Sequence, residues 1–288
     1  MINEPLVSVL MTAYNREVYI IDAIESVLAS TYKNFELIIV DDCSADKTVS
    51  IAGEYKMKDN RVRVYLNKDN LGDYPNRNRA ASLANGQLLM YVDSDDTIVP
   101  NAIEYVVEQF KRFPNTKYAT IYHYDDIKDS QVLTSEGAIK LHFYKHPFLH
   151  MGPGGTVITR EFFEKLGGFP IEYGPANDTY YNIKAACNSD VLLMPYDYLN
   201  YRRHDGQEIN NWYSYLFNGY RYFEDAMKLN ELPLSPNETA YLSKKNKRRF
   251  IVNTSKYLFK TGEFKKVFRA YQYANFKVRD FLKGLINY

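Results

Sequence analysis

The sequence contains few cysteines and no long apolar run. Only Cys43 and Cys187 are cysteines among 288 residues, so a framework of disulfides is not expected. The most apolar segments, such as residues 37–40 and 88–92, fall far short of the roughly 18 residues that a membrane-spanning helix needs. The first residues show neither the basic nor the apolar region of a secretion signal. These absences predict a globular protein of the reducing cytoplasm.

Several motifs of other enzyme classes are also missing. No G-x-G-x-x-G sequence follows the first expected strand, which disfavours a dinucleotide-dependent dehydrogenase. The chain has no Walker A loop, no H-E-x-x-H pair and no cysteine pattern for zinc. Any phosphate or metal chemistry must therefore come from a different set of residues.

Strand and helix patterns alternate through the first half of the chain. Continuous apolar runs predict buried inner strands, and apolar residues spaced three and four apart predict amphipathic helices. The expected strands are residues 6–11, 35–40, 62–66 and 87–92, and the expected helices are residues 16–30, 46–55, 75–85 and the segment after Pro100. This order predicts an α/β fold with a doubly wound, mostly parallel sheet, which binds ligands beyond the carboxyl ends of its strands.

The rest of the chain predicts a less regular middle and a helical end. Residues 113–175 are expected to form loops and short strands over the sheet. From about residue 210 the pattern becomes helical, and Ser235-Pro-Asn-Glu238 has the sequence of a capping box. A second helix is expected after a turn at Gly262. We therefore divide the chain into a catalytic domain, residues 1–210, and a C-terminal helical region, residues 211–288.

Acidic residues follow two of the expected strands. They occupy positions 41–42 after the second strand and three of positions 93–96 after the fourth. Parallel neighbouring strands would bring these carboxylates to one edge of the sheet, where a divalent cation would relieve their repulsion. Mg²⁺ and Mn²⁺ accept carboxylate oxygens and share the rest of their shell with phosphates. A single acid after a strand is more often a turn or cap residue, and that interpretation is preferred for Asp46 and Asp96.

The order and spacing of many motifs resemble the family 2 glycosyltransferases of the GT-A fold. The resemblance covers residues 5–110 almost without gaps and continues more weakly to about residue 205. The motifs that carry it are Val7-Ser-Val9, Thr12-Ala-Tyr-Asn15, Phe35-Glu-Leu-Ile-Ile-Val-Asp-Asp-Cys-Ser44, Arg77-Asn78, Ala84-Asn-Gly86 and Tyr91-Val-Asp-Ser-Asp-Asp96.

The resemblance implies an inverting, nucleotide-sugar-dependent enzyme with Mn²⁺ or Mg²⁺ as its cofactor. Such an enzyme would move a hexosyl or N-acetylhexosaminyl group, with a UDP-sugar as the favoured donor, to an acceptor hydroxyl. The implied acceptor is a glycan or a lipid-linked saccharide in surface polysaccharide or glycolipid synthesis.

Roles on the donor side follow from the same resemblance. Asp42 would read the nucleotide base by hydrogen bonding, and Asp95 would ligate the metal ion. The residues assigned to donor binding are Thr12, Tyr14, Asn15, Asp42, Arg77, Asn78, Asp93 and Ser94. For Arg77 and Asn78, hydrogen bonding at the start of a helix is an equally supported alternative. Cys43 departs from the family, which usually has glycine there.

Two later segments resemble the acceptor side and the metal side of the family's site. Asn177-Asp178 stands where the family usually has Glu-Asp, and Asp178 would be the general base on the acceptor hydroxyl. A helix N-cap is the alternative role for Asp178. The segment 201–204 resembles a Tyr-Arg-x-His motif whose histidine approaches the metal, so His204 is assigned to the metal site, although a lone histidine is usually a surface or packed residue.

Two further features of these later segments have alternative interpretations. Arg202 or Arg203 would help to neutralise the diphosphate. The glycine-rich residues 152–155 would bring backbone close to the acceptor or the diphosphate, or would form only a turn.

The C-terminal region is strongly basic. Residues 221–288 contain 15 Lys or Arg and 6 Asp or Glu, a net charge of +9, whereas the whole chain carries +1. Phenylalanines and tyrosines lie between the basic residues, which suits peripheral docking onto anionic lipid at the inner face of the membrane. A solvated helix face is the alternative. Nucleic-acid binding is disfavoured, because the acidic remainder of the chain would repel phosphates.

Two other functions remain open. A sugar nucleotidyltransferase would normally carry a glycine-rich, basic phosphate loop after the first strand, which residues 12–16 do not provide. A non-catalytic sugar-nucleotide-binding protein on the same fold would be expected to have lost the metal acids or the base, and both are retained.

Overall fold

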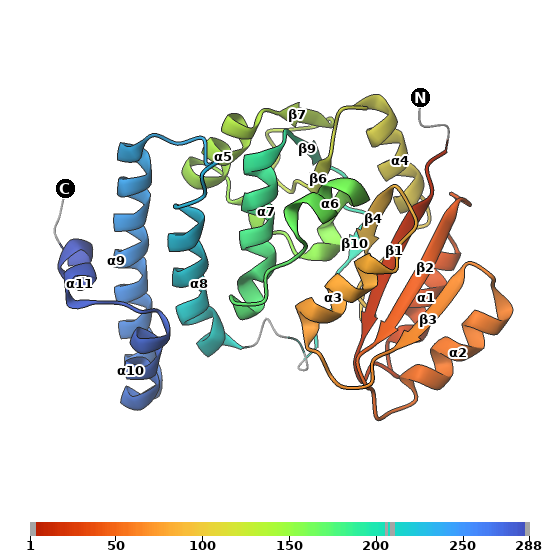
Figure 1. The fold of residues 1–288 in the computed structure, drawn as a ribbon, viewed down its shortest axis with the longest axis horizontal. Helices are drawn as coiled ribbons and strands as arrows, with labels where there is room; N and C mark the ends of the chain where they lie inside the picture. Colours follow the sequence, from red (N-terminus) through yellow and green to blue (C-terminus); the bar gives the residue numbers. More distant parts are fainter. Residues whose placement is uncertain (1–3, 205–206, 208–210, 286–288) are drawn as a thin grey trace.

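A computed structural model of the chain describes residues 4–204, 207 and 211–285. An eight-stranded sheet in the order β3-β2-β1-β4-β8-β6-β9-β7 forms its centre, and helices cover both faces (Figure 1). Two further strands, β5 and β10, form an antiparallel pair beside it. The strands are β1 (Val7–Ala13), β2 (Phe35–Asp41), β3 (Val62–Leu66), β4 (Leu88–Tyr91), β5 (Thr97–Ile98), β6 (Tyr118–Ile121), β7 (Gln131–Leu133), β8 (Thr156–Thr159), β9 (Val191–Met194) and β10 (Leu199–Asn200).

The helices lie on both faces of the sheet and at one end of the molecule (Figure 1). The α-helices are α1 (Ile20–Leu28), α2 (Thr48–Lys58), α3 (Asp73–Ser82), α4 (Ala102–Arg112), α5 (Ser135–Tyr144), α6 (Arg160–Leu166), α7 (Asn177–Asn188), α8 (Trp212–Ala226), α9 (Pro236–Thr261), α10 (Phe264–Tyr273) and α11 (Val278–Leu285). The short 3-10 turns are η1 (Phe148–His150), η2 (Pro153–Gly155) and η3 (Gly174–Ala176).

The N-terminal half of the sheet is parallel and follows the expected alternation of strands and helices. β1 pairs with β2 and with β4, and β2 pairs with β3, all in parallel. Every residue of β1 and β2 is buried, as expected of inner strands covered on both faces. Helices α1 and α4 pack on one face, whereas α3, α6 and α7 pack on the other. The predicted α/β fold is therefore confirmed.

The middle of the chain extends the sheet itself, contrary to the expectation for residues 113–175. β8 lies antiparallel between β4 and β6, β9 runs parallel to β6, and β7 closes the edge. β6 and β8 have the sequences Tyr-Ala-Thr-Ile and Thr-Val-Ile-Thr, which are too short to show a clear period. Their position is decided by pairing with strands distant in sequence, and the local pattern does not report such pairing.

The C-terminal helices pack beside α7, with α8 against α7 and α9, and with α10 and α11 against α9 (Figure 1). Tyr222 of α8 and Leu242 of α9 belong to the same buried cluster as Leu10 of β1, so the helical region shares a core with the sheet. The predicted capping box at Ser235 is present, and α9 ends at Gly262 with a φ of 69°. Among the described helices, none combines the length and the apolar composition that a membrane crossing requires.

Candidate active site

A large cavity opens at the carboxyl ends of β1, β2 and β4. Its volume is about 960 Å³, within the range of pockets that hold small organic ligands. Thr12 of β1, Asp42 after β2 and Ser94 after β4 all line it. The assigned residues that line this cavity are Thr12, Tyr14, Asp42, Arg77, Asp93, Ser94, Asp95 and Asp178. One cavity is thus lined both by residues assigned to the donor and by Asp178, which is assigned to the acceptor.

Asp42 organises one wall of the cavity. Its carboxylate accepts hydrogen bonds from the backbone N–H groups of Leu71 and Gly72, at 2.8 and 2.9 Å, and from Asn67 Nδ2, at 2.6 Å. Gly72 has a φ of 88°, which glycine adopts without strain, and the chain enters α3 from there. Since a carboxylate has about four acceptor positions, Asp42 keeps capacity for one further donor.

Arg77 and Asp93 form a bidentate ion pair in the cavity lining. Nη1 and Nη2 of Arg77 donate to Asp93 at 2.5 and 3.1 Å, and Nε donates to Asp73 at 2.8 Å. Burial by itself lowers the pKa of Arg77, but the carboxylates of Asp73 and Asp93 outweigh it and raise that pKa well above its ordinary value. Arg77 is therefore a permanent positive charge that holds Asp93 in place.

Asp93, Asp95 and Asp96 form a compact acidic cluster. Each offers a carboxylate oxygen, and these oxygens all lie within 4.8 Å of one another. A set of hard oxygen donors at this spacing fits Mg²⁺ or Mn²⁺. Burial, followed by the nearby charge of Asp93, raises the pKa of Asp96 to about 7.

The interpretation of Asp96 as a turn residue is incomplete. Its backbone N–H does form the expected turn, with a hydrogen bond to the Asp93 carbonyl at 2.9 Å. Its side chain, however, is only 2% exposed and joins the acidic cluster. Asp46 does act at a helix start as interpreted, since its Oδ1 accepts from the Thr48 N–H at 2.9 Å.

Two side chains from distant segments reach Asp95. Arg16 Nε and His204 Nε2 both lie 3.0 Å from Asp95 Oδ2. His204 stacks on Tyr19 with ring centroids 4.6 Å apart, which positions the imidazole beside the cluster. Arg202 anchors the same segment through hydrogen bonds to the backbone carbonyls of Tyr19 and Asp95. The structure thus places His204 next to one acid of the cluster and engages Arg202 in holding that segment.

Asp178 faces the cavity from the first turn of α7. The helix begins at Asn177 with Ala176 as its N-cap, so Asp178 is not the cap residue. Its Oδ1 accepts from the Thr179 N–H at 2.5 Å, and a Cβ atom added to Gly152 would lie 3.9 Å from its Oδ2. Burial raises the pKa of Asp178 to about 7, and the hydrogen bonds from Thr179 oppose that shift only in part. A carboxyl group with this pKa can accept and release a proton near neutral pH.

Asn15 and Asn78 hold loops near the cavity but do not line it. Asn15 has a φ of 52°, and its Oδ1 accepts from the Ala45 N–H at 2.9 Å. Asn78 brackets Phe169, since its Oδ1 accepts from the Phe169 N–H at 2.8 Å and its Nδ2 donates to the Phe169 carbonyl at 2.9 Å. Both side chains therefore act on the backbone that shapes the site.

Sequence analysis missed several residues of the cavity, among them Arg16, Asp73, His150 and Tyr215. Arg16 directly follows the motif Thr12-Ala-Tyr-Asn15, and Asp73 lies four residues before Arg77-Asn78. Their closeness to these motifs was the signal that could have assigned them to the site. His150 and Tyr215 come from η1 and α8, whose positions relative to the sheet depend on the packing of α7.

Comparison with known proteins identifies the family. The profile of Glycosyl transferase family 2 matches residues 8–167, more than half of the chain. Glycosyltransferase GlyG of Streptococcus pneumoniae serotype 4 is 35% identical over 122 residues, which cover 42% of this chain and 40% of GlyG. TuaG of Bacillus subtilis (strain 168), named for teichuronic acid biosynthesis, is 37% identical over 120 residues, 40% of this chain and 48% of TuaG. The matched segments thus span less than half the length of these relatives.

Solved structures match the fold of nearly the whole chain. S. aureus TarS 1–349 in complex with UDP-GlcNAc aligns with a TM-score of 0.74 and 19% identity, covering 97% of this chain and 81% of that one. The mannosyltransferase PcManGT from Pyrobaculum calidifontis, in complex with GDP-Man and Mn²⁺, aligns with a TM-score of 0.63 and 16% identity, covering 99% and 88%. The expected GT-A-type fold is confirmed, and the protein belongs to Glycosyl transferase family 2.

Proposed function

We propose that this protein is an inverting, metal-dependent glycosyltransferase. It would transfer a hexosyl or N-acetylhexosaminyl group from a nucleotide-diphosphate sugar to an acceptor hydroxyl. The observation that carries the proposal is the single cavity that joins Arg77, Asp93, Asp95 and Asp178. TarS with UDP-GlcNAc and PcManGT with GDP-Man support a nucleotide sugar as the donor, and a UDP-sugar is favoured because TarS aligns with the higher TM-score.

The donor would lie across the carboxyl ends of β1, β2 and β4. Tyr14 is about half exposed at the end of β1, so its ring face is open to a nucleotide base. Asp42 keeps acceptor capacity for an N–H group of that base. Thr12, Asp93 and Ser94 line the path towards Asp95, while Asn15 and Asn78 act by holding the adjoining loops.

Asp178 would act as the general base. The acceptor oxygen forms a bond to the anomeric carbon on the face opposite the leaving group, and the bond from that carbon to the diphosphate oxygen breaks. The hydroxyl proton passes to the Asp178 carboxylate. Because the new bond and the broken bond lie on opposite faces, the configuration at the anomeric carbon inverts. With a pKa of about 7, Asp178 is ionised in a large fraction of molecules at neutral pH.

Asp93, Asp95 and Asp96, with His204 beside Asp95, would hold Mn²⁺ or Mg²⁺. When bound, such an ion neutralises the charge that develops on a departing nucleoside diphosphate. Two arginines add positive charge beside the acidic cluster. Arg16 pairs with Asp95 at 3.0 Å, and Arg77 pairs with Asp93 at 2.5 Å. The Mn²⁺ in the PcManGT complex supports this assignment.

A donor screen tests the proposal. The unfolding temperature is measured with UDP-, GDP- and dTDP-sugars, each with Mn²⁺ and with EDTA. A donor at 100 times its Kd adds about 2.7 kcal/mol to the free energy of unfolding. We expect a shift with one nucleotide class that disappears in EDTA. Asp95→Asn should lose this shift, whereas Asp190→Asn, an exposed acid outside the cavity, should keep it.

Three other results, one from the screen and two from activity assays, would change this conclusion. No shift with any nucleotide sugar would overturn the proposal. Binding without any release of nucleoside diphosphate in the presence of glycan acceptors would favour the non-catalytic alternative. Synthesis of a nucleotide sugar from a nucleoside triphosphate and a sugar phosphate would favour the nucleotidyltransferase.

The proposed acceptor is a glycan or lipid-linked saccharide of surface polysaccharide or glycolipid synthesis. TuaG is named for teichuronic acid biosynthesis and WcaA of Escherichia coli K12 for colanic acid biosynthesis, which supports a polysaccharide pathway. We place the reaction in the cytoplasm, at the inner face of the membrane.

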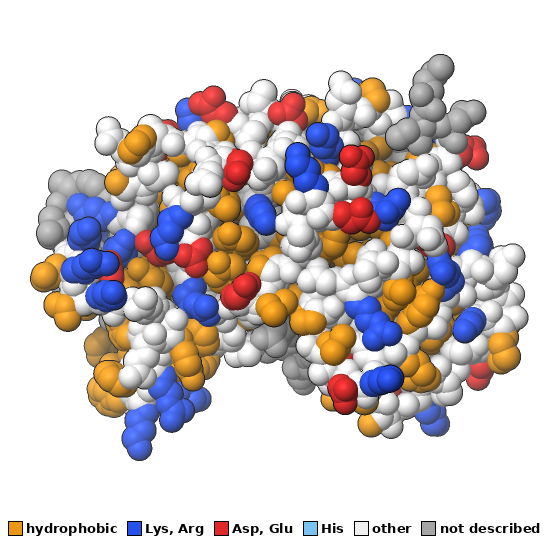
Figure 2. Space-filling view, viewed as in Figure 1, with side chains coloured by type: hydrophobic (Ala, Val, Ile, Leu, Met, Phe, Trp, Pro, Cys, Tyr) orange, Lys and Arg blue, Asp and Glu red, His pale blue; other side chains and the backbone are white. Residues whose placement is uncertain are grey.

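The surface of α10 and α11 supports a peripheral contact with anionic lipid. We call its apolar part the tail face, which consists of the exposed side chains of Phe264, Phe268, Val278, Phe281 and Leu282. Within each helix these residues are spaced by three or four positions and so share one side of it. Figure 2 shows Lys and Arg side chains gathered around hydrophobic ones at this end of the molecule.

An anionic membrane is the occupant that the charge of this region favours. A second copy of the chain would bring its own basic helices against the first and repel them. Phosphatidylglycerol headgroups, in contrast, would attract lysine and arginine by about 1 kcal/mol for each residue near the surface. The apolar rings would then enter the headgroup boundary.

A further inference from the structure

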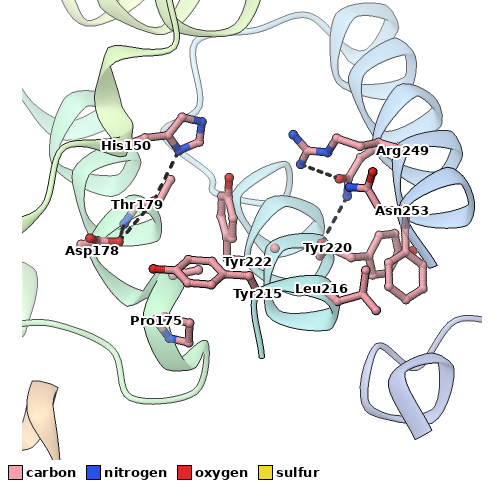
Figure 3. A pocket seen from close by; sticks show the side chains of 14 residues that line it. His150, Pro175, Asp178, Thr179, Tyr215, Leu216, Tyr220, Tyr222, Arg249 and Asn253 are labelled. Carbon is pink, nitrogen blue, oxygen red and sulfur yellow. Dashed lines mark hydrogen bonds between the residues drawn. The ribbon is translucent and has the colours of Figure 1, made fainter. Parts of the chain in front are cut away.

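A second cavity adjoins the donor cavity and lies between α7 and the C-terminal helices (Figure 3). Its volume is about 340 Å³. It shares His150, Pro175, Asp178 and Tyr215 with the larger cavity, so Asp178 stands at the boundary of the two. We propose that this second cavity binds the acceptor and selects an acidic saccharide, whose carboxylate or phosphate is held by Arg249. The inference rests on the function proposed above, because it takes Asp178 as the base that the acceptor hydroxyl approaches.

Arg249 brings a positive charge from α9 into this cavity. Its Nη2 donates to Asn246 Oδ1 at 3.0 Å, and its guanidinium carbon lies 5.4 Å from the centre of the Phe223 ring. Within the described part of the chain, Arg249 forms no ion pair, whereas Lys247 on the same helix pairs with Glu224 at 3.0 Å. The guanidinium is therefore oriented by an amide and a ring, and its charge is left for a ligand.

The two ends of the cavity carry opposite charges. Figure 3 shows Asp178 on one side and Arg249 on the other, with Tyr215 and Tyr222 between them. His150 also lines the cavity, but burial and the charge of Arg249 lower its pKa to about 4, so it is neutral at pH 7. An anionic group bound at Arg249 would thus sit away from Asp178, and the saccharide that carries it would extend towards the base.

The wall between these charges suits a sugar ring. Tyr215, which is 38% exposed, can pack its ring against the C–H face of a pyranose, whereas Tyr220, Tyr222 and Phe250 are buried and form the base of the wall. Tyr220 stacks on Phe250 with centroids 4.8 Å apart. Asn246 is buried, and its Nδ2 donates to the Tyr220 carbonyl at 3.2 Å, which turns its Oδ1 towards Arg249. The binding wall is thus held in place before any ligand enters.

Guanidinium is suited to acidic sugars because of its shape as well as its charge. Its planar fork binds a carboxylate or a phosphate through two parallel hydrogen bonds. The net charge of +9 on residues 221–288 would also raise the local concentration of an anionic glycan near this cavity.

Binding of three related sugars to the full chain tests the inference. Glucuronate, glucose 6-phosphate and glucose are compared by ligand-observed NMR with UDP and Mg²⁺ present. A charge-assisted hydrogen bond predicts that at least one of the two anions binds roughly tenfold or more tightly than glucose. Preference for glucuronate alone assigns a uronic acid, preference for glucose 6-phosphate alone assigns a sugar phosphate, and preference for both assigns the shared anion chemistry.

Variants of α9 show whether Arg249 causes the preference. Arg249→Gln should abolish it, and Arg249→Lys should keep part of it, because the charge remains while the fork is lost. Arg248→Gln removes the neighbouring exposed arginine, which does not line the cavity, and should keep the preference in full. Asn253→Asp, one helical turn beyond Arg249, should suppress the preference by adding a carboxylate while the arginine stays in place.

The UDP signal in the same samples separates this inference from the proposed function. Normal UDP binding with equal affinity for all three sugars, or with an unchanged preference in Arg249→Gln, would overturn the anion site alone. Absence of UDP binding together with an Arg249-dependent preference would leave an anion site and remove its acceptor role.

Discussion

Asp178 is the residue whose surroundings predict a pH dependence. Its pKa is raised from 3.8 to about 7, chiefly by burial, so the base is protonated below that pH and ionised above it. Transfer should therefore increase as pH rises through about 7. Asp178→Asn should lower turnover by roughly 10²–10⁴-fold, the usual contribution of a general base, and should remove this limb of the pH profile. Initial rates between pH 5 and 9 measure both effects.

Two controls separate loss of the base from loss of structure. The folded protein disfavours the ionised form of Asp178, whose pKa is raised from its ordinary value of 3.8 to about 7. This group therefore lowers the free energy of unfolding increasingly as the pH rises above 3.8. The Asn variant should consequently be at least as stable as the parent at pH 8. Asp190→Asn, at an exposed acid, should change neither the rate nor the profile. Near-normal turnover in Asp178→Asn would remove the assignment.

Cys43 stands where the family usually has glycine, and its backbone conformation gives the physical reason for that preference. Its φ is 69°, in the left-handed region that residues other than glycine adopt at a cost of roughly 1–2 kcal/mol. This conformation accounts for the usual glycine at that position. The residue follows directly after Asp42, so the strain lies beside the donor cavity.

At the scale of single elements, the N-terminus of α9 offers a direct test. Ser235 Oγ accepts from the Glu238 N–H at 3.3 Å, and Glu238 Oε2 accepts from the Ser235 N–H at 2.8 Å. Ser235→Ala should lower the free energy of unfolding by about 1 kcal/mol, because the Glu238 N–H at the start of the helix loses the Ser235 Oγ that accepts its hydrogen bond. Chemical denaturation of the purified chain measures this difference.

Ser255→Ala is the matched control within the same helix. Position 255 lies in the interior of α9, where alanine is the better helix former, so this change should be neutral or slightly stabilising. Equal destabilisation by both substitutions would contradict a specific role for the cap.

The elements that sequence analysis recovered share one physical property. The helix at residues 102–112 carries repeating apolar positions and the helix at residues 236–261 carries a capping box, so chemistry within each segment determines them. β6 and β8 contain four residues each and have no such signal. They become strands because β4 presents an edge with which β8 can pair.

At the scale of the whole molecule, the tail face predicts salt-dependent binding to vesicles. Co-sedimentation should be strong with phosphatidylglycerol vesicles at low salt, weak with phosphatidylcholine, and reduced at high salt because ions screen the basic residues. Replacing Lys265 and Arg269 with Gln should weaken binding by roughly 30-fold, since each of the two charges contributes about 1 kcal/mol near the surface. Replacing Phe264 and Phe268 with Ser should also weaken it, because apolar insertion is lost.

An equivalent change on α2 provides the control for membrane binding. Lys56→Gln combined with Met57→Ser removes one charge and one exposed apolar side chain far from the tail face in the fold, and binding should persist (Figure 1). Binding that ignores both salt and lipid charge would contradict the proposal. A dimer that the Phe264 and Phe268 changes dissociate would instead assign the tail face to a second copy of the chain.

The amino-acid sequence alone predicted the strand–helix order of the first half of the chain, the acids at the strand ends and the resemblance to the family. These features depend on residues close together in the chain, where apolar spacing and short motifs report local structure. Which of those residues share a cavity depends on how distant segments pack together in three dimensions. Asp178 and Asp95 line the same cavity, and Arg16 pairs with Asp95 of the acidic cluster. Asn15 and Asn78 instead hydrogen-bond to backbone groups of neighbouring loops. The tertiary structure also placed Arg249 at the far end of a cavity that Asp178 lines, because that cavity arises from the packing of α8 and α9 beside α7, which no local pattern encodes.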